Sequence, residues 1–348
     1  MKREPLTVLL AKVWTAQTIE IDNAVEAAGA SLLGRRVRIS LATWANGLRV
    51  IDESGTSLEH LRQRARADTN VGGLERWGWI TVGDGEPGGM RRPGYGSGRG
   101  LRAGTVLRPT PGGTAARRLW PAMVQEVEDR WRHRFSPGLV DTLRRAGERI
   151  TAGLPWAPPQ VNPSDGFRTH LVTGDGQADG PDRPLVVLLG QALTALTARC
   201  ETGALASLPL AANVLTALDD AAVPRRSLPA RTGLSKEAIA MAVSFLARRE
   251  LGTVGSGGAV SLTATGRAAL ADHRRRVGAD AGPEGLEEAV ASVLDQPAAL
   301  AAGLEPPAGC WRSERPYLTQ TRRLLADPVA ALPRHPMVLH RGGWPDGS

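Results

Sequence analysis

The chain repeats itself, and this internal repeat limits its fold more than any other feature of its 348 residues. Identical residues recur at matched positions in four pairs of segments, among them leucines in every pair. The pairs are 9–18 with 188–197, 40–48 with 207–215, 74–82 with 246–254, and 107–112 with 262–266. Since all four pairs keep one order along the chain, the sequence predicts a duplicated unit, at about 6–134 and 185–276.

The second copy has the pattern of a helix-turn-helix followed by a β-hairpin. Ser235 is a favourable N-cap for its longest helix, and glycines fill the turn between its two strands. The predicted elements are, in order, helices at 209–220, 228–233 and 236–249, strands at 253–254 and 260–262, and a helix at 267–276. This order predicts a winged helix-turn-helix.

The first copy predicts the same order with a longer wing. Its elements are helices at 41–51, 58–64 and 69–77, strands at 79–82 and 105–108 around a wing at 83–104, and a long helix at 115–134. The third of these helices contains Gly72 and Gly73, each of which costs about 1 kcal/mol relative to alanine. The long helix carries an apolar stripe that we expect to pack within the chain rather than against a second subunit, at Leu119, Met123, Val127 and Trp131.

We therefore predict a mainly α fold with small β wings, in which two winged helix-turn-helix units in one chain form an internal pseudo-dimer. The predicted divisions are 1–150 for the first unit with its N-terminal helix and the long helix after the wing, 151–184 for a linker rich in proline and glycine, 185–277 for the second unit, and 278–348 for a second linker, short helices and a C-terminal tail. Both a monomer with internal pseudo-symmetry and a homodimer are compatible with this arrangement.

Positive charge gathers in two parts of the chain. The whole chain carries 43 Lys+Arg against 35 Asp+Glu, a formal net charge of +8. Residues 31–134 hold 18 arginines against 10 acidic residues, and residues 205–276 hold nine arginines and one lysine against five acidic residues. Two basic segments predict contact with a polyanion, and solvated arginines enriched by coding bias are the alternative explanation.

The rest of the composition excludes several classes of protein. Two cysteines are too few for a disulfide scaffold or a cysteine zinc site, and no run approaches the roughly 18 apolar residues of a membrane span. We expect a cytoplasmic protein with no membrane contact, no metal and no cofactor. Cys200 is expected in the core, while Cys310 is the better candidate for a redox-sensing thiol. Segment 165–170 is expected to be a solvated loop rather than a catalytic site.

Six segments carry a resemblance to a known family, and they are 9–23, 40–52, 74–80, 127–135, 234–249 and 332–348. They resemble the MarR-like tandem winged-helix regulators of GC-rich, actinobacterial-type bacteria. The resemblance covers most of the chain outside its loops. It implies a DNA-binding transcriptional regulator with double-stranded DNA as its partner, and it leaves room for a small-molecule effector.

A winged helix places the second helix of its helix-turn-helix in the major groove, and its wing contacts phosphates or the minor groove. The residues expected to contact DNA lie on the first wing and on the reading helix of the second copy: Arg91, Arg92, Arg99, Arg102, Lys236, Met241, Ser244 and Arg248. This reading helix offers few side chains that form paired hydrogen bonds to a base. Its alternative role is to line a pocket or to pack on the other copy.

An effector pocket is expected between the first helix and a winged unit, with aromatic walls and polar anchors. The candidate residues are Trp14, Gln17, Trp44, Asn46 and Arg49. Asn46 and its counterpart Asn213 have a second interpretation, in which their amides satisfy a helix end or bridge the two units.

Three functions are compatible with these patterns. A DNA-binding regulator without enzymatic activity is the first. A winged-helix DNA repair glycosylase is the second, and it requires a carboxylate or glutamine beside a flipped base. A ligand- or protein-binding module that does not bind DNA is the third, and the alanine and methionine of the reading helix favour it. We expect the first function, because no paired catalytic motif stands out. The sequence leaves the operator, the effector and the sign of regulation open.

Overall fold

Among the residues that the structure describes, the fold is mainly helical with three small antiparallel sheets, which confirms the expected fold class at this level. The computed structural model describes residues 4–34, 37, 39–66, 69, 71–83, 101–152, 154, 156–159, 182–201, 203–206, 211–218, 221–279, 282–314, 317–335, 339–340 and 344–345. No helix within these ranges has both the length and the apolar character needed to cross a bilayer.

The first half of the chain ends with two long helices. Its elements are α1 (Leu6–Leu32), α2 (Leu41–Ala45), η1 (Leu48–Val50), β1 (Thr56–Ser57), α3 (Leu58–Ala65), α4 (Val71–Arg76), β2 (Ile80–Gly83), β3 (Val106–Pro109), α5 (Pro111–Phe135) and α6 (Pro137–Ala152). The strands pair in the order β1-β3-β2, with Val82 opposite Leu107.

The second half repeats this order, except that β4 comes before η3, and then adds a C-terminal extension. Its elements are α7 (Leu185–Glu201), α8 (Asn213–Leu218), β4 (Val223–Pro224), η3 (Arg225–Ser227), α9 (Leu228–Thr232), α10 (Lys236–Arg248), β5 (Gly252–Val254), β6 (Ala259–Leu262), α11 (Ala264–Ala279) and α12 (Leu286–Leu294). The extension holds α13 (Pro297–Leu304), η4 (Trp311–Ser313), α14 (Leu318–Ala326), α15 (Pro328–Ala331), β7 (Leu339–His340) and β8 (Trp344–Pro345). The sheet order β4-β6-β5 matches that of the first half.

The corner after each hairpin is built in the same way in both halves. Thr110 caps α5 by accepting the N–H of Gly113 at 3.0 Å, and Thr263 accepts the N–H of Gly266 at 2.9 Å. Each threonine also donates its hydroxyl to a carbonyl oxygen before the first strand of the hairpin, at 2.8 Å and 2.7 Å. The matched blocks of the sequence therefore fold into matched local structure.

These corners explain why glycine is required at both positions. A Cβ on Gly113 would lie 2.0 Å from the carbonyl oxygen of Trp79, and one on Gly266 would lie 1.8 Å from that of Leu251. The sequence predicted the long helix only from residue 115, because proline and glycine at 111–113 are typical helix breakers. The threonine cap and the close approach of the backbone start α5 at Pro111 instead.

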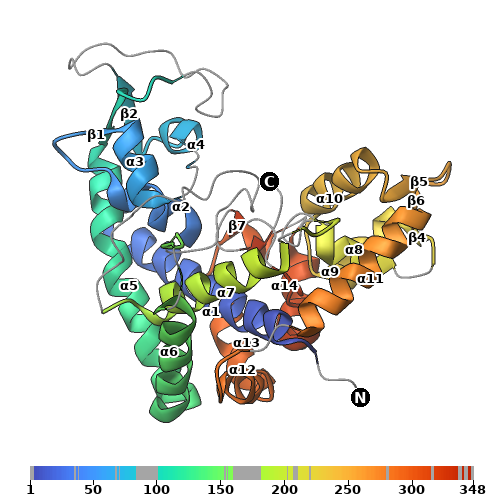
Figure 1. Cartoon of the computed structure of the whole chain (residues 1–348). Helices are drawn as coiled ribbons and strands as arrows, with labels where there is room; N and C mark the ends of the chain where they lie inside the picture. Colours follow the sequence, from blue (N-terminus) through green and yellow to red (C-terminus); the bar gives the residue numbers. More distant parts are fainter. Residues whose placement is uncertain are drawn as a thin grey trace.

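The centre of the molecule is the helix pair α1 and α7, the first helices of the two halves (Figure 1). Residues 185–197 of α7 are buried without interruption, and α1 is buried on every side along most of its length. The indole of Trp14 on α1 donates a hydrogen bond to the carbonyl oxygen of Val186 at 3.0 Å. The remaining elements lie around this pair, so each half contributes to one central layer.

Two large apolar clusters fill the interior. The larger one joins α1–α7 with α12–α15, so α7 shares its core with the first half of the chain. The second cluster contains only residues between Ala206 and Leu270, beneath α8–α11. Leu119, Val127 and Trp131 are buried in the larger cluster and Met123 packs against it, which confirms the intrachain packing expected for the α5 stripe.

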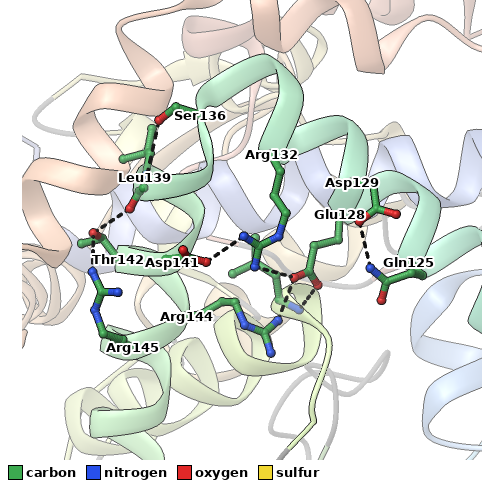
Figure 2. A network of polar contacts seen from close by, with 12 residues as sticks. Gln125, Glu128, Asp129, Arg132, Ser136, Leu139, Asp141, Thr142, Arg144 and Arg145 are labelled. Carbon is green, nitrogen blue, oxygen red and sulfur yellow. Dashed lines mark hydrogen bonds and ion pairs between the residues drawn. The ribbon is translucent and has the colours of Figure 1, made fainter.

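A buried carboxylate ties α5, α6 and α7 together (Figure 2). Glu128 accepts hydrogen bonds from Arg144 at 2.8 Å and from the backbone N–H of Leu185 at 2.7 Å, and Arg132 lies within ion-pair distance at 3.7 Å. Leu185 is the first residue of α7, where free N–H groups attract negative charge. Glu128 therefore caps the central helix as well as pairing with two arginines.

The first helix after α1 is shorter than the sequence predicts. Residues 41–51 form α2 and η1 with a turn between them at Asn46 and Gly47. A Cβ on Gly47 would lie 2.7 Å from both the carbonyl oxygen of Thr43 and the methyl group of Thr69. The close approach of residue 69 to this turn ends α2.

Candidate nucleic-acid interface

Helix α10 exposes a polar face above a fully apolar one. Ser235 caps the helix by accepting the N–H of Ala238 at 3.1 Å. The buried stripe of α10 consists of Ala238, Ile239, Ala242, Val243 and Leu246. Burial of this stripe against α8, β5 and α9 fixes which side of α10 faces solvent.

The structure brings the four predicted residues of this helix to its outer side. Lys236, Ser244 and Arg248 are exposed, and Met241 is half-buried against the second apolar cluster. More cations lie on neighbouring elements, where Arg225, Arg226 and Arg231 are exposed on η3 and α9. The face around α10 is therefore positively charged and has a hydroxyl group near its middle.

The hairpin after α10 is short. Its strands β5 and β6 pair through Val254 and Val260, and Gly258 takes a positive φ of 71° in the turn. The side chains of Thr253 and Val254 are exposed beside α10. The hairpin therefore places a small uncharged surface next to the cationic face.

The first half presents a different surface. Arg102 is exposed just before β3, while Arg91, Arg92 and Arg99 fall in 84–100, outside the described residues. The exposed face of α3 adds Arg62 and Arg64. Exposed cations of the described first half therefore lie on α3 and just before β3, and α4 contributes Arg76.

The five residues expected to line an effector pocket are mostly packed in the core. Trp14 and Gln17 are 0% and 1% exposed on α1. Trp44 stacks on Trp120 with ring centroids 5.2 Å apart. The Arg49 side chain donates to the carbonyl oxygen of Ala45 on its own turn, and Asn46 is buried in the turn after α2. None of the five lines either of the two cavities described next.

The first cavity has a volume of about 480 Å³ and lies between the start of α1 and the second half of the chain. Arg231, Arg274 and Arg334 line it, and Glu4 is the one acidic residue among its lining residues. Arg334 donates to Glu4 at 2.9 Å through one terminal nitrogen, and its buried Nε has no hydrogen-bond partner in the described part of the chain. The cavity is therefore suited to an anion.

Two histidines lie at the wall of this cavity and behind it. The rings of His273 and His335 meet edge to face with centroids 5.3 Å apart. Burial, together with the positive charges of Arg334 and Arg274, lowers the pKa of His273 to about 4. Burial, His273 and Arg334 likewise lower the pKa of His335 well below its ordinary value. Both rings are therefore neutral at pH 7.

The second cavity is a groove of about 750 Å³ between α1, α5 and α13. The carboxylate of Glu20 lines it and accepts hydrogen bonds from Arg130 at 3.1 Å, Arg134 at 2.6 Å and the Trp131 indole at 2.8 Å. Every oxygen of this carboxylate is thus engaged by the protein. Glu20 holds α5 against α1 and leaves no open anchor for a ligand.

Cys310 is not the exposed thiol that a redox sensor requires. It is fully buried, and its thiol donates a hydrogen bond to Glu26 at 3.1 Å. Burial raises the pKa of the Cys310 thiol, against the opposing charge of Arg312, so the reactive thiolate is disfavoured. Cys200 is also buried, as expected for a core residue.

The buried acidic residues of α1 were not predicted from the sequence. Glu20, Asp22 and Glu26 interrupt an otherwise apolar run, and this interruption is the signal that could have identified them. Burial raises the pKa of Asp22 well above its ordinary value, against the charge of Arg312. Among the described residues, no group of three or more His, Cys, Asp or Glu side chains is arranged to hold a metal ion.

Comparison with known proteins adds no further evidence: no family model, no curated protein and no solved structure matches the chain. The geometry and charge of the α10 face and of the arginine-lined cavity are therefore the features that bear on function.

Proposed function

We propose that the protein is a DNA-binding transcriptional regulator whose two halves are winged helix-turn-helix units arranged as an internal pseudo-dimer. The observation that carries the proposal is the exposed face of α10, where Lys236, Ser244 and Arg248 project from a helix that follows short α9 and precedes a hairpin. A helix in this position of a winged helix enters the major groove. The matched element order and the matched threonine corners support the same fold for both halves.

The charge of the chain supports double-stranded DNA as the partner. Exposed arginines of η3 and α9 lie beside α10, and Arg64 and Arg102 are exposed in the first half. When such cations bind phosphates, condensed counterions are released from the DNA, so affinity falls steeply as the salt concentration rises. A regulator of this kind requires no catalytic group, and we propose no enzymatic activity.

Binding of duplex DNA at increasing salt tests this proposal. Fluorescence anisotropy with labelled genomic fragments should give an affinity whose logarithm falls linearly with the logarithm of salt concentration. The double variant Lys236→Ala/Arg248→Ala should lose at least about tenfold in affinity. Arg118→Ala on α5 is the matched control and should bind like the parent chain. The Arg118 side chain is 78% exposed and forms a surface ion pair with Glu53. Failure to bind any duplex at low ionic strength would remove the proposal.

The 480 Å³ cavity supports control by a small organic anion. It touches α9 through Arg231 and α1 through Glu4, so a ligand there would bridge the second half of the chain and the central helices. A panel of mono- and dicarboxylates should contain compounds that raise the melting temperature, because ligands that bind only the folded state stabilise it. Arg231→Ala should abolish this increase, and Arg226→Ala, exposed on η3 and outside the lining, should not.

A binding module that does not use DNA is the second candidate. The half-buried Ala240 and Met241 on the outer side of α10 favour it, because small apolar side chains suit contact with a protein. Charge distinguishes the two candidates. If the Lys236→Ala/Arg248→Ala variant keeps full biological activity, the binding module is the better description. The glycosylase alternative predicts abasic sites in alkylated DNA, and we expect none.

A further inference from the structure

The two helices that occupy equivalent positions in the two halves differ greatly in length. Helix α4 has six residues and α10 has 13. At about 1.5 Å per residue these lengths correspond to roughly 9 Å and 20 Å. In Figure 1 both helices lie in the upper half of the view, on either side of α1 and α7. One half therefore has a reading helix of normal length, and the other has less than two turns.

Helix α4 also presents no neutral hydrogen-bonding side chain to a base edge. Val71, Gly73 and Leu74 are buried, which leaves Gly72, Glu75 and Arg76 toward solvent. Gly72 has no side chain, and a carboxylate at Glu75 is repelled by phosphate. The Arg76 guanidinium lies 5.5 Å from the ring centroid of Trp77, over its face. This helix therefore has no free neutral donor or acceptor for a base edge.

Helix α10 retains such groups. Ser244 is an exposed hydroxyl that both donates and accepts hydrogen bonds. Met241 is an apolar side chain of the kind that contacts a thymine methyl group. Lys236 and Arg248 flank them at the two ends of the helix, where they reach phosphates. Base discrimination is therefore concentrated in the second half.

The first half keeps cations without a reading helix. Arg64 on α3 and Arg102 just before β3 are exposed. Arginines placed around a hairpin bind phosphates of any sequence. This half therefore contributes affinity and position along the duplex rather than recognition of particular bases.

We propose that the two halves divide DNA recognition, so that the preferred site is asymmetric. This inference rests on the proposed function. The second half reads one block of base pairs through Met241 and Ser244, and the first half holds the phosphates about one helical turn away without base preference. A homodimer must present two identical readers. A duplicated chain is free of this restriction, and here the two readers have diverged.

Selection from a random duplex library tests the division directly. We expect the recovered sequences to share a single block of preferred bases, with footprinting showing protection that extends about ten base pairs to one side of it. Two blocks related by inverted symmetry would overturn the inference while supporting DNA binding. A library from which no duplex is retained would instead overturn the proposed function.

Variants of the two helices give the matched comparison. Ser244→Ala and Met241→Ala should each change the recovered base preference and weaken binding to the selected duplex by at least about fivefold. Glu75→Ala on α4 should leave the base preference unchanged. Arg64→Ala and Arg102→Ala should weaken all duplexes equally and each reduce the salt slope by about one. A base preference that moves with Glu75→Ala, or that is unaffected by both α10 variants, would refute the division.

Discussion

The side-chain amide of Asn213 is hydrogen-bonded to the backbone of His335 in both directions. Its Oδ1 accepts the His335 N–H at 3.0 Å, and its Nδ2 donates to the His335 carbonyl oxygen. Both residues are buried, and 122 positions separate them in the chain. The C-terminal extension is therefore fastened to α8, a structural role for the Asn213 amide that differs from the helix end or bridge between units expected from the sequence.

Asn213→Ala should lower the free energy of unfolding by about 2–4 kcal/mol, because the change leaves a buried backbone N–H and C=O without partners. Urea denaturation followed by circular dichroism measures the change. Gln296→Ala is the control, since Gln296 is exposed and bonds only within its own turn. The control should alter stability by less than about 0.5 kcal/mol. Equal stability of the two variants would contradict the fastening role.

Stability should fall as the pH falls below 6.5, because of His273 and His335. Both pKa values are lowered in the folded state, so the unfolded chain takes up protons at a higher pH than the folded chain. The stabilisation is therefore complete above the unfolded value of about 6.5 and is lost as the pH falls toward 4. Urea midpoints at pH 7.5, 6.0 and 5.0 measure the slope. His273→Gln should make the slope shallower, and the exposed His60→Gln is the control. An identical slope in His273→Gln would reject this explanation.

Removing the Glu128 carboxylate should destabilise the protein by about 3–5 kcal/mol. Glu128→Ala leaves Arg144 without a buried partner and uncaps α7 at Leu185. Glu126→Ala on the same helix is the matched control, because Glu126 is exposed and forms an ordinary surface pair with Arg130. The control should change stability by less than about 0.5 kcal/mol. Thermal and urea unfolding of both variants measure the change. Similar losses of unfolding free energy in the two variants would rule out a special role for Glu128.

Alanine should be poorly tolerated in place of the glycine in either of the two corners that follow the hairpins. Gly113→Ala and Gly266→Ala both force a methyl group onto a backbone carbonyl oxygen, so each should cost more than about 3 kcal/mol. Gly138→Ala in the first turn of α6 is the control, since no atom lies within 4 Å of its Cβ position. The control should be neutral or stabilising by up to about 1 kcal/mol. Soluble yield and melting temperature report the difference. Normal stability of both corner variants would mean that the two corners are not the tight contacts described.

The repeat carried most of what the sequence could predict about the fold. The helix predicted at 236–249 differs from α10 by one residue. Local signals suffice there, because Ser235 caps α10 and the apolar spacing marks its buried face. At Gly113 and Gly47 a contact between residues distant in sequence determines where a helix begins or ends, so the local pattern predicted the wrong helix bounds.

The candidate surfaces were less predictable than the fold. Lys236, Ser244 and Arg248 are exposed as expected, because an amphipathic helix fixes its outer side from the sequence alone. The arginine-lined cavity could not be foreseen, since Glu4, Arg231 and Arg334 come from three distant parts of the chain. The tryptophans assigned to a pocket are packed in the core instead, as the Trp44–Trp120 stack illustrates.

Burial of both cysteines makes the chain convenient for site-directed labelling. Cys200 and Cys310 are the two cysteines of the sequence, and neither presents its thiol to solvent. A single thiol introduced by Ser244→Cys would therefore react with a maleimide dye long before the native ones. Such a probe would test in real time whether DNA approaches α10, without first replacing the native cysteines.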